Sequence, residues 1–424
     1  MKRGFYTIMS AQFLSSLADN ALFVAAVELL RSQNADEWQR AALVPMFALF
    51  YVVLAPFVGA YADSKPKGHV MLVSNSIKVI GCLMMLFGVH PLLAYAVVGL
   101  GAAAYSPAKY GILTELLPPQ DLVKANGWIE GLTIASIILG VLLGGQLVGP
   151  VVGGWLLQAI PSGLNWSAQE AAIACLVLLY AAAAWVNTRI PLTGVDLRPI
   201  PSNPLALVPD FWHCNRLLWK DKLGQISLST TTLFWGVSGN LRYIVLAWAT
   251  VALSYNTTQA STLVGVVAIG TALGAVAASI RMKLEYAPRV MPLGILMGLL
   301  VVLMIFIRNV EVAAPFLILL GALGGFLVVP MNALLQHRGH MLMGAGRSIA
   351  VQNFNEQACI LALGFLYSSA TGMGLSAFAA IAAFGLLVAS VMWLIKKWHQ
   401  HNMVHHGEEL ERLYQIARGS NSPH

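Results

Sequence analysis

Charged side chains are scarce in this chain of 424 residues: Asp, Glu, Lys and Arg make up 10%, whereas apolar residues make up 58%. Soluble domains carry about 25% charged residues, so an ordinary soluble fold is excluded. Enzyme signatures are also missing, since the chain has no G-x-S-x-G, H-E-x-x-H or G-x-x-x-x-G-K-[ST] motif and no His followed five residues later by Asp. These absences argue against a lipid hydrolase, an acyltransferase and an ATPase, and we expect no enzymatic activity.

Metal ligands and disulfides are also poorly represented. The four cysteines have neither metal-ligand spacing nor an evident disulfide framework, so free thiols are expected. A cluster of His399, His401, His405 and His406 lies near the C-terminus, where a solvated tail is the better interpretation than a metal site. We therefore predict neither a metal nor a cofactor.

Long apolar runs are abundant instead. Each run is long enough to cross a bilayer, which predicts an all-α, multi-pass membrane protein. The twelve predicted spans are 5–30, 41–61, 69–89, 91–114, 122–149, 169–188, 226–252, 258–280, 288–307, 312–335, 344–370 and 374–395.

The basic residues are distributed unevenly between the two sides of these spans. Nineteen of the 25 Lys and Arg residues fall on the side of the termini, and only Arg31, Arg40 and Arg308 fall on the other. Because cytoplasmic loops retain basic residues, both termini are predicted to be cytoplasmic. The net charge of +7 then reflects orientation and contact with anionic membrane lipids, and no nucleic-acid partner is expected.

The two halves of the chain resemble each other at an offset of about 220 residues. The matching segments are "FLSSLADN" ending at Asn20 and "LFWGVSGN" ending at Asn240, "GAYADS" from Gly59 and "GAVAAS" from Gly274, and "GAAAYSP" ending at Pro107 and "GGFLVVP" ending at Pro330. Their shared order supports a duplicated six-helix unit, as in transporters with parallel repeats.

The repeat predicts the domain organisation. Between the halves, "NPLALVPDFWHCNRLLWKDKL" has the aromatic and basic residues of an interfacial amphipathic helix. We expect an N-terminal six-helix bundle over 1–190, a cytoplasmic linker over 191–225, a C-terminal six-helix bundle over 226–397 and a cytoplasmic tail over 398–424.

The loop "GAYADSKPKGH" between the second and third spans resembles the loop signature of the major facilitator superfamily. The signature has Gly, three variable residues, Asp and then basic residues around a Gly. The matching residues are Gly59, Asp63, Lys65, Lys67 and Gly68. The resemblance implies the twelve-helix major facilitator fold with two pseudo-symmetric bundles, and a loop that latches helices in one access state.

Six further segments narrow the resemblance: "FLSSLADNALF", "GAAAYSPAKYGIL", "LVKANGWIE", "LFWGVSGNLR", "VVPMNALLQ" and "GAGRSIAVQNFNE". Together they resemble the bacterial lysophospholipid transporters of that superfamily. The resemblance implies movement of lysophospholipids such as lysophosphatidylethanolamine across the inner membrane and a functional link to an acyltransferase that rebuilds the diacyl lipid. Carried over by resemblance, the functional charges are Asp19, Lys109, Arg242 and Glu356. We expect a monomer.

Six Asp, Glu, Lys and Arg residues lie in the interior of the predicted spans, about five or more residues from either end: Asp19, Lys78, Lys109, Glu130, Arg242 and Glu356. Such residues are costly in hydrocarbon, so they pair with one another or line a cavity. Their charges sum to zero, which favours internal pairing or a zwitterionic cargo. Lys78 has no counterpart in the repeat, so a role in holding helices together is favoured for it.

The repeat also suggests how these charges meet. Asn20 maps to Asn240, which would present Asp19 and Arg242 at similar depth across a central cavity, while Glu130 maps near the turn that precedes Glu356. In this interpretation Arg242 grips the lipid phosphate, Lys109 adds positive charge, and the carboxylates accept hydrogen bonds from the head group.

A second functional interpretation rests on "GQLVGPVVGG" from Gly145 to Gly154, which resembles the fifth-helix signature of proton-coupled drug antiporters. The predicted fourth span has Lys109 and no Arg, whereas those antiporters place an Arg there. A proton-coupled exporter of drugs or amphiphiles is therefore the alternative, and a membrane-embedded lipid enzyme is the alternative of another class.

Overall fold

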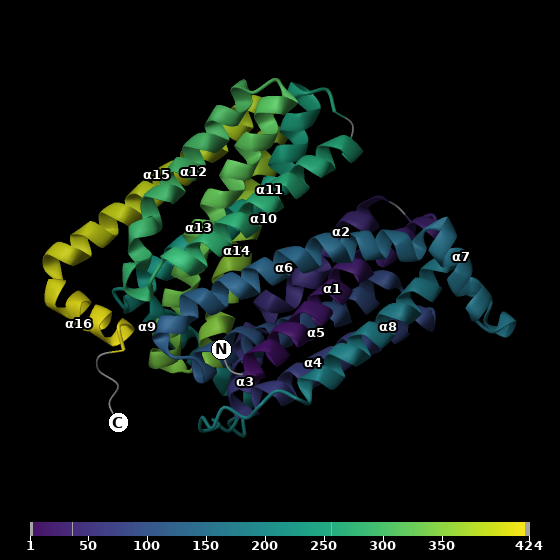
Figure 1. Ribbon diagram of the computed structural model, residues 1–424, viewed down its shortest axis with the longest axis horizontal. Helices are drawn as coiled ribbons and strands as arrows, with labels where there is room; N and C mark the ends of the chain where they lie inside the picture. Colours follow the sequence, from purple (N-terminus) through teal and green to yellow (C-terminus); the bar gives the residue numbers. More distant parts are fainter. Residues whose placement is uncertain (1–2, 36, 256, 420–424) are drawn as a thin grey trace. The chain divides into compact units, whose positions relative to one another are not determined.

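The computed structural model describes residues 3–35, 37–255 and 257–419, and every regular element among them is a helix (Figure 1). The first part of the chain forms α1 (Arg3–Ser32), α2 (Glu37–Val53), α3 (Ala55–Ser64), α4 (Lys67–Leu86), α5 (Pro91–Leu116), α6 (Pro119–Val148), α7 (Pro150–Ala159) and α8 (Ala168–Asn187). The second part forms α9 (Leu207–Lys220), α10 (Gly224–Ala252), α11 (Thr257–Arg281), α12 (Met291–Leu303), α13 (Val310–Met343), α14 (Ala345–Gly372), α15 (Ala377–His405) and α16 (Gly407–Ala417). Short 3-10 turns lie at Ser162–Leu164, Pro204–Ala206, Leu284–Val290 and Met304–Phe306.

All twelve predicted spans fall on helices. By length and apolar composition, nine of the described helices can cross a membrane by themselves, and α2 with α3 makes a tenth span. The predicted seventh and eleventh spans form α10 and α14, which do not pass this test among the described residues because polar side chains interrupt their apolar runs. Such interruptions are tolerated in bundles where polar side chains face protein rather than lipid.

The second span is broken rather than straight. Its two parts, Ala42–Val53 and Ala55–Ser64, meet at an angle of 65°. Pro56, at the start of α3, has no N–H to donate and its ring clashes with the preceding turn. The fifth span ends in the same way, because Gly149 and Pro150 separate α6 from α7.

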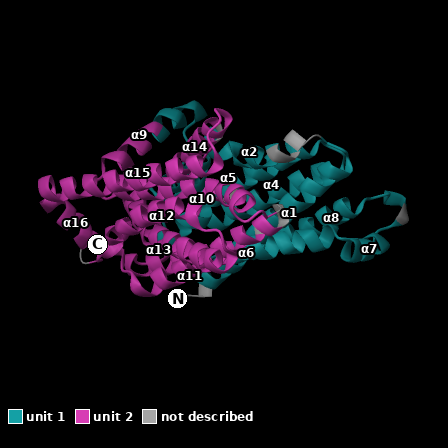
Figure 2. Ribbon diagram, turned by 90° about the horizontal axis from the view of Figure 1, so that it is seen from above, with its two compact units in different colours: residues 1–115, 135–211, 344–350 teal, residues 116–134, 212–343, 351–424 magenta. Residues whose placement is uncertain are grey.

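The helices divide into two compact units that do not follow the order of the chain (Figure 2). Unit 1 comprises residues 1–115, 135–211 and 344–350, and unit 2 comprises residues 116–134, 212–343 and 351–424. The first half of α6 therefore belongs to unit 2, and the first turns of α14 belong to unit 1.

The core of unit 1 is formed by α1, α2, α4, α5 and α8. Its fully buried side chains include Leu22, Cys82, Tyr95, Ile173 and Tyr180. Alanines on one face of α1 let the neighbouring helices approach closely, as is usual where lipid provides no hydrophobic driving force between helices.

Unit 2 is held together most tightly where α11 lies against α13. A Cβ at Gly274 would collide with the carbonyl oxygen of Ala322, and one at Gly325 would collide with the carbonyl oxygen of Thr271. Only glycine allows the two backbones to lie this close, so the packing depends on these positions.

The linker contains one α-helix after an irregular stretch over 191–203, and the described part of the tail is mostly helical. The amphipathic helix predicted in the linker is α9, which buries Leu207, Phe211, Cys214 and Leu218 on one face. The tail forms the end of α15 and then α16, whose Leu410 is buried. The expectation of a solvated histidine cluster is wrong for His399, which is 6% exposed because α16 folds back over it and brings the hydroxyl of Tyr414 to 3.5 Å from its Nε2.

Candidate functional site

The carboxylate of Asp19 has two partners within unit 1. Lys78 Nζ on α4 donates to its Oδ2 at 2.8 Å, and the Tyr180 hydroxyl on α8 donates to its Oδ1 at 2.6 Å. The Asp19 side chain is 20% exposed and that of Lys78 is 1% exposed. The pair is therefore shielded on the lysine side and accessible on the carboxylate side.

A set of polar and aromatic groups surrounds the ammonium group of Lys78. It donates to Ser15 Oγ at 3.0 Å, and Ser15 Oγ donates in turn to Asn75 Oδ1 at 2.7 Å. The rings of Tyr105 and Tyr180 lie 5.0 and 5.6 Å from the ammonium group, within the range of cation–π attraction.

The aliphatic stem of Lys78 passes α5 at Gly101. A Cβ at Gly101 would lie 2.7 Å from Lys78 Cγ, so a larger residue there would displace the stem. The ammonium group thus has ionic, hydrogen-bonding and aromatic partners at once, as a buried cation requires.

This arrangement changes the expected pairing of the span charges. The repeat placed Asp19 and Arg242 opposite each other across a cavity and left Lys78 a role in holding helices together, whereas the structure pairs Asp19 with Lys78. Lys78 does hold helices together, as expected, because its ion pair links α4 to α1, the helix that carries Asp19. Arg242 lies in α10, and its side chain falls outside the described residues.

Two other predicted site residues of unit 1 lie on the same helices or next to them. Asn20 is half-buried and donates its amide to the carbonyl of Ser16, one turn earlier on α1. Lys109 is half-buried on α5, and its ammonium group lies 4.5 Å from the centre of the Tyr110 ring.

In unit 2, Glu356 on α14 is buried and bound by an amide. Gln352 Nε2 donates to Glu356 Oε1 at 2.7 Å and to Asn332 Oδ1 on α13 at 3.0 Å. Glu130 on α6 is also buried and lies close enough for its charge to act on Glu356. Among the described residues Glu356 forms no ion pair.

A second amide pair lies one turn from Glu130. Asn126 and Gln336 exchange two hydrogen bonds of 3.0 Å between α6 and α13. Reciprocal amide bonds satisfy both side chains without charge, which suits a buried position. At the predicted site residues, unit 2 therefore presents carboxylates among amides, whereas unit 1 presents an ion pair. The buried ion pair of unit 2 lies elsewhere, between Arg338 on α13 and Asp221 directly after α9.

The predicted latch loop has a defined partner in unit 1. Asp63 Oδ1 accepts from the backbone N–H of Gly346 at 2.6 Å, and Oδ2 accepts from the N–H of Arg347 at 3.0 Å. These N–H groups belong to the first turn of α14, where a carboxylate meets both unpaired donors and the positive end of the helix dipole. Asp63 thus caps a helix whose N–H donor, at Gly346, lies 283 residues later in the chain.

The basic residues of the loop differ in role. Lys67 is buried and bridges Asp63 Oδ1 at 3.1 Å and Glu115 Oε1 at 3.0 Å. Lys65 is exposed, and its backbone ends α3.

The two glycines of the loop permit close approach. A Cβ at Gly59 would lie 2.7 Å from the Cβ of Ala350, and one at Gly68 would lie 3.1 Å from the carbonyl oxygen of Asn187. Arg347 completes the cluster by donating to Asp210 at the start of α9 at 2.9 Å.

Sequence reasoning missed Tyr180, Ser15 and Gln352 because no charge marks them. Tyr180 and Asp19 are separated by 161 residues, and Gln352 is one of several polar residues in its segment. A signal for Lys78 was present, since it is a lysine in the middle of an apolar run and its helix follows the signature loop directly.

Comparison with known proteins identifies the family of the chain. The family model described as Major Facilitator Superfamily matches residues 8–355. The Lysophospholipid transporter LplT of Yersinia pestis (strain Pestoides F) is 40% identical over 375 residues, which are 88% of each chain. The protein of the same name from Yersinia pseudotuberculosis serotype O:3 (strain YPIII) has the same identity and coverage.

Solved structures share the fold at low sequence identity. FucP, a fucose:proton symporter of E. coli, superposes in its outward conformation with a TM-score of 0.70 at 12% identity, covering 93% of this chain and 98% of its own. The human organic anion transporter MFSD10 superposes with a TM-score of 0.71 at 15% identity, covering 93% and 100%. The predicted fold class is confirmed, and the chain belongs to the LplT family of the major facilitator superfamily.

Proposed function

We propose that this protein is a lysophospholipid flippase that works by alternating access. The observation that carries the proposal is the 40% identity, over 88% of both chains, to proteins named for lysophospholipid transport. The ionisable residues in the interior of the spans are consistent with that cargo. They bring acidic and basic groups in equal number, as a zwitterionic head group requires.

The head group is bound, in this proposal, by exchange with the ion pair of unit 1. Asp19, the accessible partner, accepts the cargo amine. Lys78 is buried in this structure, so its pairing with the phosphate requires α4 to move during the cycle. A ligand with both charges gives Asp19 and Lys78 an oppositely charged partner each. A ligand with a single charge leaves one of these two residues without a partner. Asn20 lies next to Asp19 on α1 and adds a neutral hydrogen-bonding group.

The remaining proposed substrate-binding residues supply further charge. Lys109 and Arg242 attract the phosphate, with Arg242 able to bind it through two parallel N–H groups. Glu130 and Glu356 accept hydrogen bonds from the glycerol hydroxyl or the amine. The single acyl chain stays among apolar side chains and lipid.

The cellular setting is also part of the proposal. The protein lies in the inner membrane with both termini in the cytoplasm, because basic residues are concentrated on that side. It works as a monomer and delivers cargo to an acyltransferase on the cytoplasmic side. The Asp63 loop opens and closes its contact with α14 during the cycle.

The direct test is reconstituted flipping of fluorescent lysophosphatidylethanolamine, with a diacyl phosphatidylethanolamine of the same head group as control. We expect transport of the first and not of the second. Equal transport of both lipids, or of neither, would contradict the proposed substrate. Asp19→Asn serves as a near-isosteric variant, since it retains the contact with Tyr180 and removes the charge that the cargo amine requires.

An exporter coupled to protons is the alternative, favoured by the glycine and proline residues at the junction of α6 and α7. A proton gradient across the vesicle separates the two functions. Flipping that is unchanged when an uncoupler collapses the gradient supports the lysophospholipid flippase. Drug efflux that stops with the gradient supports the exporter.

A further inference from the structure

A groove separate from the charged site opens in unit 1 between the first turns of α1 and the end of α8. Its volume is about 650 Å³, within the range of ligand-binding clefts. The residues that matter for its chemistry are Tyr6, Thr7, Ser10, Trp185, Arg189 and Pro191. Ser10 lies nine residues before Asp19 on α1, or about 13 Å along the helix axis, so the groove is not part of the ion-pair site.

Arg189 is the charged group of this groove. Its guanidinium group lies 4.6 Å from the centre of the Trp185 ring, one turn earlier on α8. Among the described residues Arg189 forms no ion pair, and its side chain is exposed. A guanidinium group stacked on an indole keeps its N–H edge free to bind an oxyanion through two parallel hydrogen bonds.

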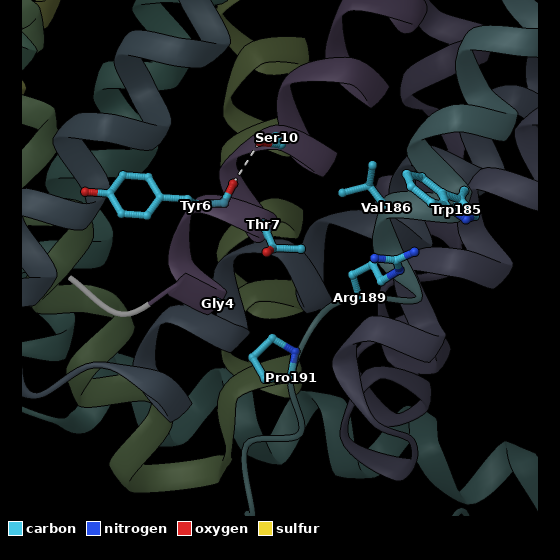
Figure 3. A pocket seen from close by; sticks show the side chains of 8 residues that line it. All are labelled: Gly4, Tyr6, Thr7, Ser10, Trp185, Val186, Arg189 and Pro191. Carbon is cyan, nitrogen blue, oxygen red and sulfur yellow. Dashed lines mark hydrogen bonds between the residues drawn. The ribbon is translucent and has the colours of Figure 1, made fainter.

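The backbone holds the groove in a defined shape. The N–H of Arg189 donates to the carbonyl of Val186 at 2.9 Å, which extends the helical turn that carries the guanidinium group. A Cβ at Gly4 would lie 2.6 Å from Pro191 Cγ. Because glycine has no side chain, the first turn of α1 can pack against Pro191, in the segment that follows α8. Figure 3 shows Arg189 and Trp185 on one side of the space and Thr7 and Pro191 on the other.

The groove lies at the end of two membrane spans, where lipid head groups lie. Trp185 is 58% exposed and Tyr6 is 56% exposed, as expected of aromatic side chains at the boundary between hydrocarbon and head groups. Leu178, two turns before Trp185 on the same face of α8, is 71% exposed. A lipid with its head group at Arg189 can therefore lay an acyl chain along Trp185 and Leu178.

We propose that this groove binds a resident diacyl phospholipid with net negative charge, with the phosphate on Arg189. A negatively charged lipid fits better than a zwitterionic one because the positive charge of Arg189 has no counter-ion among the described residues, and an amine-bearing head group would bring a second cation to it. The bound lipid is a membrane component and not the cargo, so this site does not depend on which lysophospholipid is transported.

The test measures quenching of Trp185 by lipids with brominated acyl chains. The full-length protein is placed in phosphatidylcholine nanodiscs that contain a minor fraction of brominated phosphatidylglycerol or, separately, of brominated phosphatidylcholine. The Trp185 signal is the emission of the wild type minus that of Trp185→Phe. We expect phosphatidylglycerol to be enriched at Trp185 by roughly fivefold, the amount that one basic residue near a membrane surface provides.

Matched variants identify the residue responsible. Arg189→Gln should abolish the excess quenching, whereas Arg308→Gln should leave it unchanged, since Arg308 is also exposed and lies 4.4 Å from an aromatic ring, that of Phe378 in unit 2. Arg189→Lys keeps the charge without the two parallel N–H groups and should give an intermediate value, which keeps the test valid if Arg189→Gln folds poorly.

Three outcomes would overturn the proposal. They are equal quenching by both diacyl lipids, excess quenching that persists in a folded Arg189→Gln protein, and displacement of brominated phosphatidylglycerol by an equal amount of lysophospholipid, which would make the groove a cargo site. The flipping assay is scored separately, so loss of lysophospholipid transport in the wild type would refute the proposed function and leave the lipid site intact.

Discussion

The two units differ in the polar chemistry around the predicted site residues, although unit 2 also buries one ion pair elsewhere, between Arg338 and Asp221. Unit 1 places opposite charges together, with Asp19 on Lys78 and Asp63 on Lys67. Unit 2 surrounds Glu356 with amides and joins α6 to α13 through a neutral pair of amides. The repeated backbone is similar enough that Asn20 and Asn240 each donate to the carbonyl four residues earlier, so the difference lies in the side chains.

The difference shows that a duplicated backbone need not carry the same buried polar residues in both halves. The position that matches Asp63 in the repeat is Ala278, which is fully buried and carries no charge. An ion pair can be displaced only by a ligand that brings both charges, whereas an amide network adapts to donors and acceptors alike. Experiments that change the charge in one unit and the packing in the other can therefore break or sharpen the contrast.

The largest effect is expected at the buried pair of unit 1. Lys78→Met leaves Asp19 without its cation and should lower the free energy of unfolding by about 3–5 kcal/mol, as when one partner of a buried pair is removed. Asp19→Leu should cost a similar amount. Thermal unfolding in detergent, followed by size-exclusion chromatography, measures both.

The double variant Asp19→Leu with Lys78→Met is the control, because it removes both charges together. We expect it to regain most of the stability lost by either single variant and to remain inactive in flipping. A stable Lys78→Met protein with full activity would mean that the pair is neither structural nor functional.

A smaller loss of stability is expected where unit 2 depends on packing. Gly274→Ala places a methyl group against the backbone of α13 and should cost about 1–3 kcal/mol through overpacking. Gly265→Ala on the same helix is the matched control, since a Cβ there meets nothing within 4 Å. Equal melting temperatures for the two variants would show that α11 and α13 can separate without cost.

Asp63 should have a smaller effect on folding than on the transport cycle. Asp63→Ala removes the cap of α14, which is worth about 0.5–2 kcal/mol, and leaves Lys67 with Glu115. We expect altered labelling of single cysteines from the two sides of the membrane, with head-group affinity nearly unchanged. Identical labelling in wild type and variant would exclude a latch.

The smallest change in stability is expected for Glu356→Gln. The amide keeps the shape of the side chain, and rotation of Gln352 can preserve the hydrogen bond between them, so the free energy of unfolding should change by less than about 1 kcal/mol. Flipping should fall if the carboxylate contacts the cargo. A destabilisation as large as that of Lys78→Met would mean that the negative charge of Glu356 itself stabilises the fold of unit 2.

The sequence was sufficient to predict the helices because long apolar runs admit few other structures. The break in the second span was not predicted. Pro56 lies at that break, but Pro107 and Pro330 lie inside unbroken helices, so a proline alone does not locate one. The partner of Asp19 could not be read in the same way. It depends on which helices pack against α1, and the repeat relates α1 to α10 without specifying that α4 and α8 are its neighbours.

The latch loop illustrates the same limit. Its motif was readable from Gly59 to Gly68, but its partners at Gly346 and Arg347 are backbone groups, which any residue type supplies. Only the position of the end of a helix in space defines such a site.

The cap on α14 has a consequence for synthesis of the protein. Asp63 leaves the ribosome 283 residues before Gly346, an interval of about 14–57 s at 5–20 residues per second. During that time unit 1 lacks residues 344–350, and the Asp63 carboxylate, which later accepts from their N–H groups, has Lys67 as its charged partner. Unit 1 therefore cannot be completed in the order in which it is translated, and we expect the N-terminal half of the chain to form an intermediate that lacks the start of α14.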